Sequence, residues 1–314
     1  MSAPVSSVMI PAACRVRFGA PAALVDASGG PAVLRVALPV LGGMPDERVL
    51  AETGEPVRRD GYTLFPGANS LAGFAVAALG QDLEAAAAEL YHSLFAASEG
   101  FHLYRIWNYV PAINAVEHGL ENYRRFCRGR SLAFEKHFGR GFERRLPAAS
   151  AVGAAAGPLA VGFLAGRAEP RHFENPRQVP AFEYPPEYGP RSPSFSRATA
   201  VATEQGNQIF ISGTAAIRGH RTVAADDLDR QLACTGENLR QIGETAGAGP
   251  DLGAAGGWRR SFKVYVRNPA HLARLKTQLE RELLRPEDAV SYLQADICRG
   301  DLLVEIEAVL TVAA

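Results

Sequence analysis

The alternation of hydrophobic and polar positions follows the same plan in two parts of the chain. Residues 208–213 (QIFISG) form a short β-rich run that ends at a glycine, and residues 62–67 (YTLFPG) form a matching run. Apolar residues at helical spacing follow each run, over 82–97 and 227–245. Each predicted helix begins with Asp-Leu, and an aspartate there suits the positive end of the helix dipole.

The similarity continues beyond these helices. Each copy goes on with a strand, a second helix and two strands that we interpret as a β-hairpin. The predicted strands are 103–110 and 261–267, the helices 115–126 and 270–284, and the hairpins 147–165 and 290–311. Gly67 and Gly213 are 146 positions apart, as are Gly73 and Gly219, which indicates an internal duplication. Each copy therefore predicts β-β-α-β-α-β-β, an α+β plan with mixed sheets and helices packed on one face.

A segment rich in proline and aromatic residues separates the two copies. Residues 169–196 hold too many prolines for a helix or a central strand. A plain linker is one interpretation, but five aromatic side chains favour an ordered loop, and such loops are often functional. We predict an N-terminal domain over 1–168, this connecting loop, and a C-terminal domain over 197–314.

Composition narrows the classes of protein. The 314 residues carry 33 basic and 33 acidic side chains, and this balance argues against nucleic-acid binding. Four cysteines without paired spacing argue against a disulfide scaffold or a cysteine zinc site. The first residues lack the pattern of a signal peptide, and the most apolar stretch, 148–166, is rich in Ala and Gly and contains Pro158. We predict a cytoplasmic protein with no membrane span.

The common motifs for cofactors and catalytic nucleophiles are absent from the sequence. It contains no phosphate-binding G-x-x-x-x-G-K-[ST], no G-x-S-x-G, no H-E-x-x-H and no C-x-x-C. The seven histidines are scattered and never occur at i, i+4 on one predicted helix. We predict that the protein uses neither a metal nor a cofactor.

The most informative feature is the final predicted strand, 302–310 (LLVEIEAVL). Because side chains alternate along a strand, Glu305 and Glu307 share one face. Neighbouring carboxylates raise each other's pKa, burial raises it further, and a partly protonated carboxyl is a candidate general acid. A solvent-exposed sheet face would give the same pattern. In the first copy Gly162 and Leu164 occupy the corresponding positions. Only one of the two equivalent pockets therefore carries acidic side chains, which favours a functional site in the second copy.

Arginines in aromatic surroundings form the second feature. Arginine is the natural bidentate partner of a carboxylate ligand. A surface or ion-pairing role is the alternative for each of them, and the run ENYRRFCRGR over 121–130 also resembles an RNA-binding patch, which the neutral net charge disfavours. These arginines are Arg105, Arg124, Arg125, Arg128, Arg130, Arg191, Arg197 and Arg267.

From Ser194 onward the chain resembles a Rid (YjgF-like) domain. The runs SFSRA, IFISGTA, ENLRQIGETAGA, KVYVRN and LLVEIEAVL follow that family's order. Rid proteins form trimers with a pocket between subunits, and they hydrolyse imines. Their catalytic arginine lies fifteen residues before the Glu of the EIE motif, and Val290 stands there in this chain. This departure argues against imine deamination.

From about Pro31 to its end the chain resembles the chorismatases, two-domain enzymes whose halves are both Rid-like. The runs RIWNYVPAIN, NYRRFCRGR, LPAASAVG, YPPEYGPRSPSFSRA, ISGTA and EIEA together carry this resemblance. It implies two tandem Rid-like (chorismate mutase-like) domains and cleavage of chorismate, with pyruvate released from its enol ether and no cofactor. It further implies that Glu305 protonates the enolpyruvyl methylene. The substrate-binding residues that it implies are Arg130, Arg267, Arg191, Tyr123, Tyr184 and Tyr188.

The chorismatases divide by product. Some add water and give 3,4-dihydroxycyclohexa-1,5-diene carboxylate, whereas others form 3-hydroxybenzoate, in some cases with 4-hydroxybenzoate. A cysteine seven residues before the catalytic Glu resembles the second type, and Cys298 stands there. Ala215 is a second candidate determinant of product. A simple hairpin around Gly300 would place Ala295 opposite Glu305, so Cys298 needs a bulge to come close, and a packing role stays open.

The resemblance therefore implies an enzyme that converts chorismate, a small dicarboxylate, into 3-hydroxybenzoate and pyruvate. We expect a monomer or a weak homo-oligomer, with no nucleic-acid or membrane partner. One alternative is the hydrolytic chorismatase. The alternative of another class is a non-catalytic, Rid-like metabolite-binding protein that kept the pocket and lost the reaction.

Overall fold

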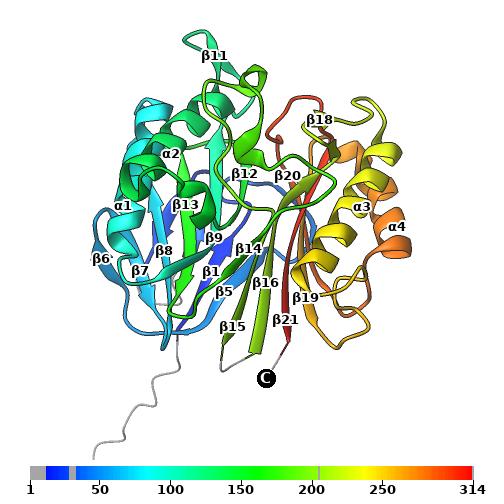
Figure 1. Ribbon diagram of the computed structural model, residues 1–314, viewed down its shortest axis with the longest axis horizontal. Coiled ribbons are helices and arrows are strands. Elements are labelled where there is room, and N and C mark those ends of the chain that lie inside the picture. Colours follow the sequence, from blue (N-terminus) through cyan, green and yellow to red (C-terminus); the bar gives the residue numbers. More distant parts are fainter. Residues whose placement is uncertain (1–11, 28–32, 204–205, 313–314) are drawn as a thin grey trace, which may run out of the picture.

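The computed structural model describes residues 12–27, 33–203 and 206–312; residues 1–11, on which the prediction of no signal peptide rests, lie outside them. The described chain contains two β-β-α-β-α-β-β units (Figure 1). The first unit consists of β7 (Tyr62–Pro66), β8 (Ser70–Val76), α1 (Leu83–Ala97), β9 (His102–Pro111), α2 (Asn122–Phe138), β12 (Ala148–Ala154) and β13 (Ala160–Gly166). The second consists of β15 (Ala198–Thr203), β16 (Gly206–Ala215), α3 (Leu228–Ala246), β19 (Arg259–Val266), α4 (Leu272–Glu282), β20 (Ala289–Gln294) and β21 (Val304–Val312).

Both units arrange their five strands in the same order. The first sheet runs β12-β9-β13-β8-β7 and the second runs β20-β19-β21-β16-β15. β6 (Val57–Arg59) extends the first sheet beyond β7, and β14 (Arg171–Phe173) extends the second beyond β15. This shared topology supports the internal duplication, and the mixed sheets with their helices confirm the α+β class.

The last two strands of each unit do not form the predicted hairpins. β9 lies between β12 and β13, and β19 lies between β20 and β21. β12 and β20 run parallel to these central strands, because each follows a helix that crosses over the sheet. Residues 295–303, which contain Gly300, therefore form a crossing loop from one side of β19 to the other.

The helix predicted over 115–126 begins later and is longer. Residues 112–121 first make a small two-stranded excursion, β10 (Val116–Glu117) paired with β11 (Leu120–Glu121). α2 then continues through a polar run, because its apolar face packs against α1. At Gly129 the two helices approach so closely that a Cβ atom would lie 2.2 Å from the backbone oxygen of Glu84. The helix predicted over 270–284 is shorter, since residues 269–271 form a 3-10 turn before α4.

The helices cover the outer faces of the two sheets, α1 and α2 on the first and α3 and α4 on the second (Figure 1). The inner faces share a third core with an N-terminal sheet of order β2-β3-β1-β5. Its strands are β1 (Ala12–Arg17), β2 (Leu24–Asp26), β3 (Val33–Arg35) and β5 (Asp46–Thr53). This arrangement brings the inner face of β21 against β9 and β12 of the first unit, which is where Glu305 and Glu307 point.

Two segments link the units. β4 (Val40–Gly43) pairs with β20 at the edge of the second sheet, although it precedes the first unit in the chain. The connecting segment 169–196 is ordered, with 3-10 turns over Ala181–Glu183 and Pro186–Tyr188. The domain boundaries at 168 and 197 stay a prediction. Strands from both sides of residue 168 join the second sheet, because β4 of the predicted N-terminal domain pairs with β20 and β14 of the connecting segment pairs with β15.

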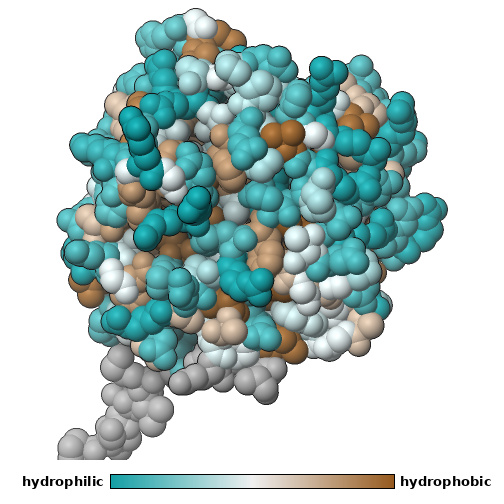
Figure 2. Space-filling model, viewed as in Figure 1, coloured by the Kyte–Doolittle hydropathy of each residue, from teal (hydrophilic) through white to brown (hydrophobic). Residues whose placement is uncertain are grey.

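The viewed face of the molecule is mostly hydrophilic, with apolar side chains scattered among polar ones (Figure 2). Exposed large apolar residues such as Leu79 and Val116 belong to turns and to the small hairpin, and isolated residues of this kind are normal on a protein surface. Among the described residues, every helix is too short or too polar to cross a membrane.

Candidate active site

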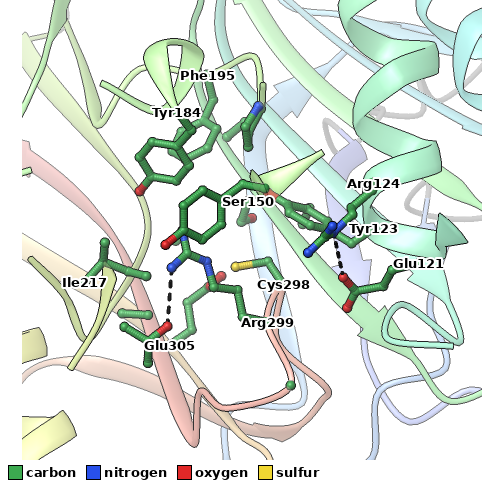
Figure 3. A pocket seen from close by; sticks show the side chains of 18 of the residues that line it. Glu121, Tyr123, Arg124, Ser150, Tyr184, Phe195, Ile217, Cys298, Arg299 and Glu305 are labelled. Atoms are coloured by element: carbon green, nitrogen blue, oxygen red, sulfur yellow. Dashed lines mark hydrogen bonds and ion pairs between the residues drawn. The ribbon is translucent and has the colours of Figure 1, made fainter. Parts of the chain in front are cut away.

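A cavity of about 370 Å³ lies where the two units meet under the connecting segment, a volume suited to a small metabolite. α2 and β12 of the first unit form one wall, and β16, β21 and the loop 295–303 form the other. Figure 3 shows side chains from these elements converging, with Tyr123 and Arg124 on one side, Ile217 and Glu305 on the other, and Cys298 and Arg299 between them.

Glu305, on β21, presents its carboxyl group to this cavity. The residue is 4% exposed, and its Oε1 has no hydrogen-bond partner among the described residues. Burial raises the pKa of Glu305 to about 8, and the negative charge of Glu307 adds to the shift, while Arg105 and Arg197 oppose it. The carboxyl group is thus protonated near neutral pH and can donate a proton into the cavity.

β16 makes room for this carboxyl group. Ala215 pairs directly with Glu305 across the two strands, just after an irregularity between Ile211 and Thr214. A Cβ atom at Gly213 would lie 2.1 Å from Oε1 of Glu305. Glycine at 213 therefore leaves the space that the acid occupies.

Glu307 is ionised, unlike Glu305. Arg105 Nη2 lies 2.7 Å from its Oε2, and Lys263 Nζ lies 2.5 Å from its Oε1. Burial opposes ionisation, but these two cations prevail and lower the pKa of Glu307 to about 2. The expectation that the two carboxyls raise each other's pKa is right for Glu305 and wrong for Glu307, because only Glu307 is paired with cations.

Arginine side chains line the cavity from both walls. Arg130 of α2 is 1% exposed, and its Nε has no hydrogen-bond partner among the described residues. Arg197 has a carboxylate oxygen of Glu174 at 3.8 Å from its Nε, too far for a hydrogen bond. Arg124 is paired with Glu121 at 3.4 Å. Arg130 and Arg197 therefore keep hydrogen-bonding capacity for an anionic ligand.

Tyrosine side chains cover the cavity together with a further arginine. Tyr184 and Tyr188 stand with their ring centroids 5.5 Å apart, and the Tyr184 hydroxyl accepts a hydrogen bond from Arg197 at 2.8 Å. The guanidinium carbon of Arg299 lies 4.1 Å from the centroid of the Tyr188 ring. Tyr123 lines the opposite wall on α2. The structure thus brings together at one cavity all three tyrosines that the family resemblance implied.

Cys298 also lines the cavity, from the loop 295–303. Burial raises the pKa of its thiol, and the nearby negative charge of Glu305 in its ionised form raises it further, so Cys298 is a neutral thiol close to the acid. No bulge is needed to bring it there, because the loop crosses over β19 instead of turning back as a hairpin.

The structure places Arg267 and Arg191 outside the cavity lining. Arg267, just after β19, donates hydrogen bonds to the backbone oxygens of Leu302 at 2.7 Å and Arg299 at 2.8 Å, so its guanidinium braces the loop 295–303. Arg191 forms an ion pair with Glu135 of α2 at 2.8 Å. Both arginines have protein partners in place of a ligand.

Sequence reasoning did not single out Arg299 or Ser150. Arg299 was not predicted to line the site because residues around Gly300 were interpreted as a hairpin turn. Ser150 on β12 lines the cavity and accepts a hydrogen bond from Arg105 at 2.9 Å. A serine among the alanines of a buried strand was the available signal for it.

The protein thus consists of two tandem α+β units with a small-molecule site where they meet. A buried carboxyl group and arginine side chains line this site. The family model described as "Chorismatase FkbO/Hyg5-like, N-terminal" matches residues 52–165. A crystal structure of a chorismatase superimposes with a TM-score of 0.83 and 30% identity, over 98% of this chain and 95% of that one. The chain belongs to the chorismatase family.

Curated relatives agree with this assignment. A 3-hydroxybenzoate synthase of Streptomyces hygroscopicus is 40% identical over 231 residues, which are 70% of this chain and 67% of that protein. A chorismatase of Streptomyces rapamycinicus is 39% identical over 220 residues, which are 66% of this chain and 63% of that protein. The aligned regions thus span about two thirds of the length of these relatives.

Proposed function

We propose that this chain converts chorismate into 3-hydroxybenzoate and pyruvate, with or without 4-hydroxybenzoate. The observation that carries the proposal is the buried carboxyl group of Glu305, which has no hydrogen-bond partner for its Oε1 among the described residues and faces a cavity lined by arginines. The relatives named chorismatase and 3-hydroxybenzoate synthase support the choice of substrate.

Chorismate carries two carboxylates, so its site needs cations on two sides. Arg130 is available on the first wall, and Arg197 and Arg299 on the second. We assign carboxylate binding to these three residues in place of Arg267 and Arg191. The tyrosines Tyr123, Tyr184 and Tyr188 would enclose the ring and its side chain and exclude water, which strengthens the electrostatic interactions inside.

In the proposed reaction Glu305 gives its proton to the methylene carbon of the enolpyruvyl group, which becomes a methyl group. The bond between the ring and the ether oxygen breaks, and that oxygen leaves as the keto oxygen of pyruvate. The oxygen of the neighbouring ring hydroxyl bonds to the cationic carbon that the ether left, and the proton of this hydroxyl returns Glu305 to its acid form. The older ring bond of the same oxygen then breaks, the ring proton on its new carbon is lost, and the oxygen is protonated, which gives 3-hydroxybenzoate. Loss of the ring proton beside a hydroxyl that stays in place gives 4-hydroxybenzoate instead. Atoms balance without water, since chorismate contains the sum of 3-hydroxybenzoate and pyruvate.

The choice of product depends on whether water reaches the cation before the ring hydroxyl does. Cys298 and Ala215 both stand beside Glu305, so we propose that they shape this part of the cavity and favour the aromatic product. A hydrolytic enzyme would instead admit one water and release the diene diol with pyruvate.

The test is incubation of the purified protein with chorismate, followed by chromatographic separation of the products. Pyruvate together with an equal amount of 3-hydroxybenzoate would support the proposal. Pyruvate with the non-aromatic diol would establish the hydrolytic reaction, and binding of chorismate without turnover would indicate a metabolite-binding protein. The cytoplasmic location and the monomeric or weakly associating state stay predictions.

A further inference from the structure

Four charged side chains from three sheets meet in the interior beside the cavity. They are Glu307 of β21, Lys263 of β19, Arg105 of β9 and Glu47 of β5, and Lys263 forms ion pairs with both Glu307 and Glu47. All four are buried, with side-chain exposures of 1% to 9%. A buried charge is tolerated only when partners compensate it, and in this cluster two cations face two carboxyl groups.

Within the cluster, Glu307 has the fullest set of partners. Besides Arg105 and Lys263, it accepts hydrogen bonds from Trp107 Nε1 and from the Tyr265 hydroxyl, each at 3.1 Å. Burial, in contrast, raises the pKa of Glu47. Two cations and two hydrogen-bond donors therefore hold Glu307 in its ionised form at neutral pH.

Glu305 lies next to this charge, and the ion pairs of Arg105 and Lys263 are made with Glu307. Glu305 and Glu307 are two positions apart on the same face of β21, which places their Cα atoms about 7 Å apart. The other charged or titratable groups that face Glu305 are Arg105 from β9, Arg197 directly before β15, and Cys298 from the loop 295–303.

We infer that Glu307 is a positioning residue for the acid: its fixed charge, held by Arg105 and Lys263, keeps the catalytic proton on Glu305 between turnovers. This inference rests on the proposed function. It gives the cations of β9 and β19 a role beyond joining the sheets, because without them a buried Glu307 would take up a proton and lose its effect on Glu305.

The test compares pH profiles of kcat/KM for the wild type, Glu307→Gln and the control Glu47→Gln. The acid must be protonated to act, so activity falls as the pH rises through its pKa. Removing the charge of Glu307 should move this fall to lower pH by roughly one unit or more, the size expected for one charge at this separation. Glu47→Gln disturbs the same cluster but does not act directly on Glu305, so its profile should follow the wild type.

An unmoved profile in Glu307→Gln, or an equal shift in both variants, would overturn the inference. If Glu307→Gln does not fold, the double variant with Lys263→Met removes one anion and one cation of the same ion pair and should still move the fall to lower pH, because Glu307 is the nearer of the two to Glu305. Infrared titration measures the protonation of Glu305 without substrate. The protonated carboxyl band of Glu305 is the one that Glu305→Gln removes, and its disappearance with rising pH should move to lower pH in Glu307→Gln. A wild type that leaves chorismate unchanged would refute the proposed function, whereas an unmoved band would refute this inference alone.

Discussion

Gly213 on β16 stands against the carboxyl group of Glu305 on β21, and only the missing side chain of the glycine gives Oε1 its place. The backbone of Gly213 has no positive φ, so any residue could adopt its conformation. The requirement for glycine here comes from the neighbouring acid. A methyl group at position 213 would collide with the flexible end of the Glu305 side chain. It would also lie 3.3 Å from the Cβ of Ser150.

Gly213→Ala should therefore separate activity from stability. The added methyl group displaces the Glu305 carboxyl while the backbone stays in place, so we expect kcat to fall by about 10²-fold, as for a misplaced general acid, with a change in the free energy of unfolding of only about 1 kcal/mol. Chorismate turnover and urea unfolding of the same preparations measure the two effects.

The matched control is Gly236→Ala on α3, where the nearest atom to an added Cβ would be Arg240 Nη1 at 3.5 Å. This variant should keep wild-type turnover and gain slightly in stability, because alanine is the better helix former. Equal turnover in Gly213→Ala and Gly236→Ala would contradict the placement of the acid.

Glu305→Gln keeps the size of the side chain and removes the proton that the reaction needs. We expect turnover to fall by about 10²-fold or more, while chorismate still binds. In the wild type, kcat/KM should be highest below the raised pKa of about 8 and fall above it, since the ionised form cannot donate a proton. The residual activity of Glu305→Gln should lack this fall. Wild-type rates in the variant would refute the role of Glu305 as the acid.

Cys298→Ala opens a small space beside the acid without changing charge, because the thiol is neutral. We expect the ratio of 3-hydroxybenzoate to other products to change more than the total consumption of chorismate. Chromatography of the products at equal conversion measures the ratio. Cys14→Ala removes a buried thiol from the core between the sheets and should leave the ratio alone. An unchanged ratio in Cys298→Ala would make this thiol a packing residue.

Arg130 and Arg267 should respond differently to substitution. Arg130→Lys removes the planar group that we assign to a carboxylate, so KM should rise about tenfold or more with little change in Tm. Arg267→Lys cannot reproduce the hydrogen bonds that brace the loop 295–303, so both Tm and kcat should fall. Steady-state kinetics and thermal unfolding distinguish the two outcomes, and the reverse pattern would restore Arg267 as a ligand of the substrate.

The repeat in the sequence predicted the order of elements in both units, because glycine positions and helical spacing are local signals. Pairing between strands is not local. The apolar runs around Gly157 and Gly300 looked like hairpins since a short turn separates them in the chain, yet β9 and β19 are inserted between the paired runs. The start of α2 was missed because residues 112–121 form a separate excursion that the apolar pattern does not reveal.

The candidate site was likewise predictable only where local sequence signals determine the structure. Alternation along the strand placed Glu305 and Glu307 on one face, and the resemblance to the chorismatases implied that Glu305 is the acid. Its free state and the paired state of Glu307 depend on Arg105 and Lys263, which come from other strands. The direction of the Arg267 side chain likewise depends on a loop whose path only the tertiary structure sets. The sequence therefore predicted which side chains could act as acids or bind carboxylates, but not which ion pairs and hydrogen bonds these side chains form in the folded protein.

The position of β4 determines how the chain can be divided. A fragment that starts at residue 197 would lack β4, and the edge of β20 would then present unpaired backbone groups to other molecules, a recognised route to aggregation. It would also lack Glu47, and Lys263 would lose one of its two buried counter-ions. The second unit is completed by a strand and a charged side chain that precede the first unit in the chain, so we expect the two units to fold together and not as separable domains.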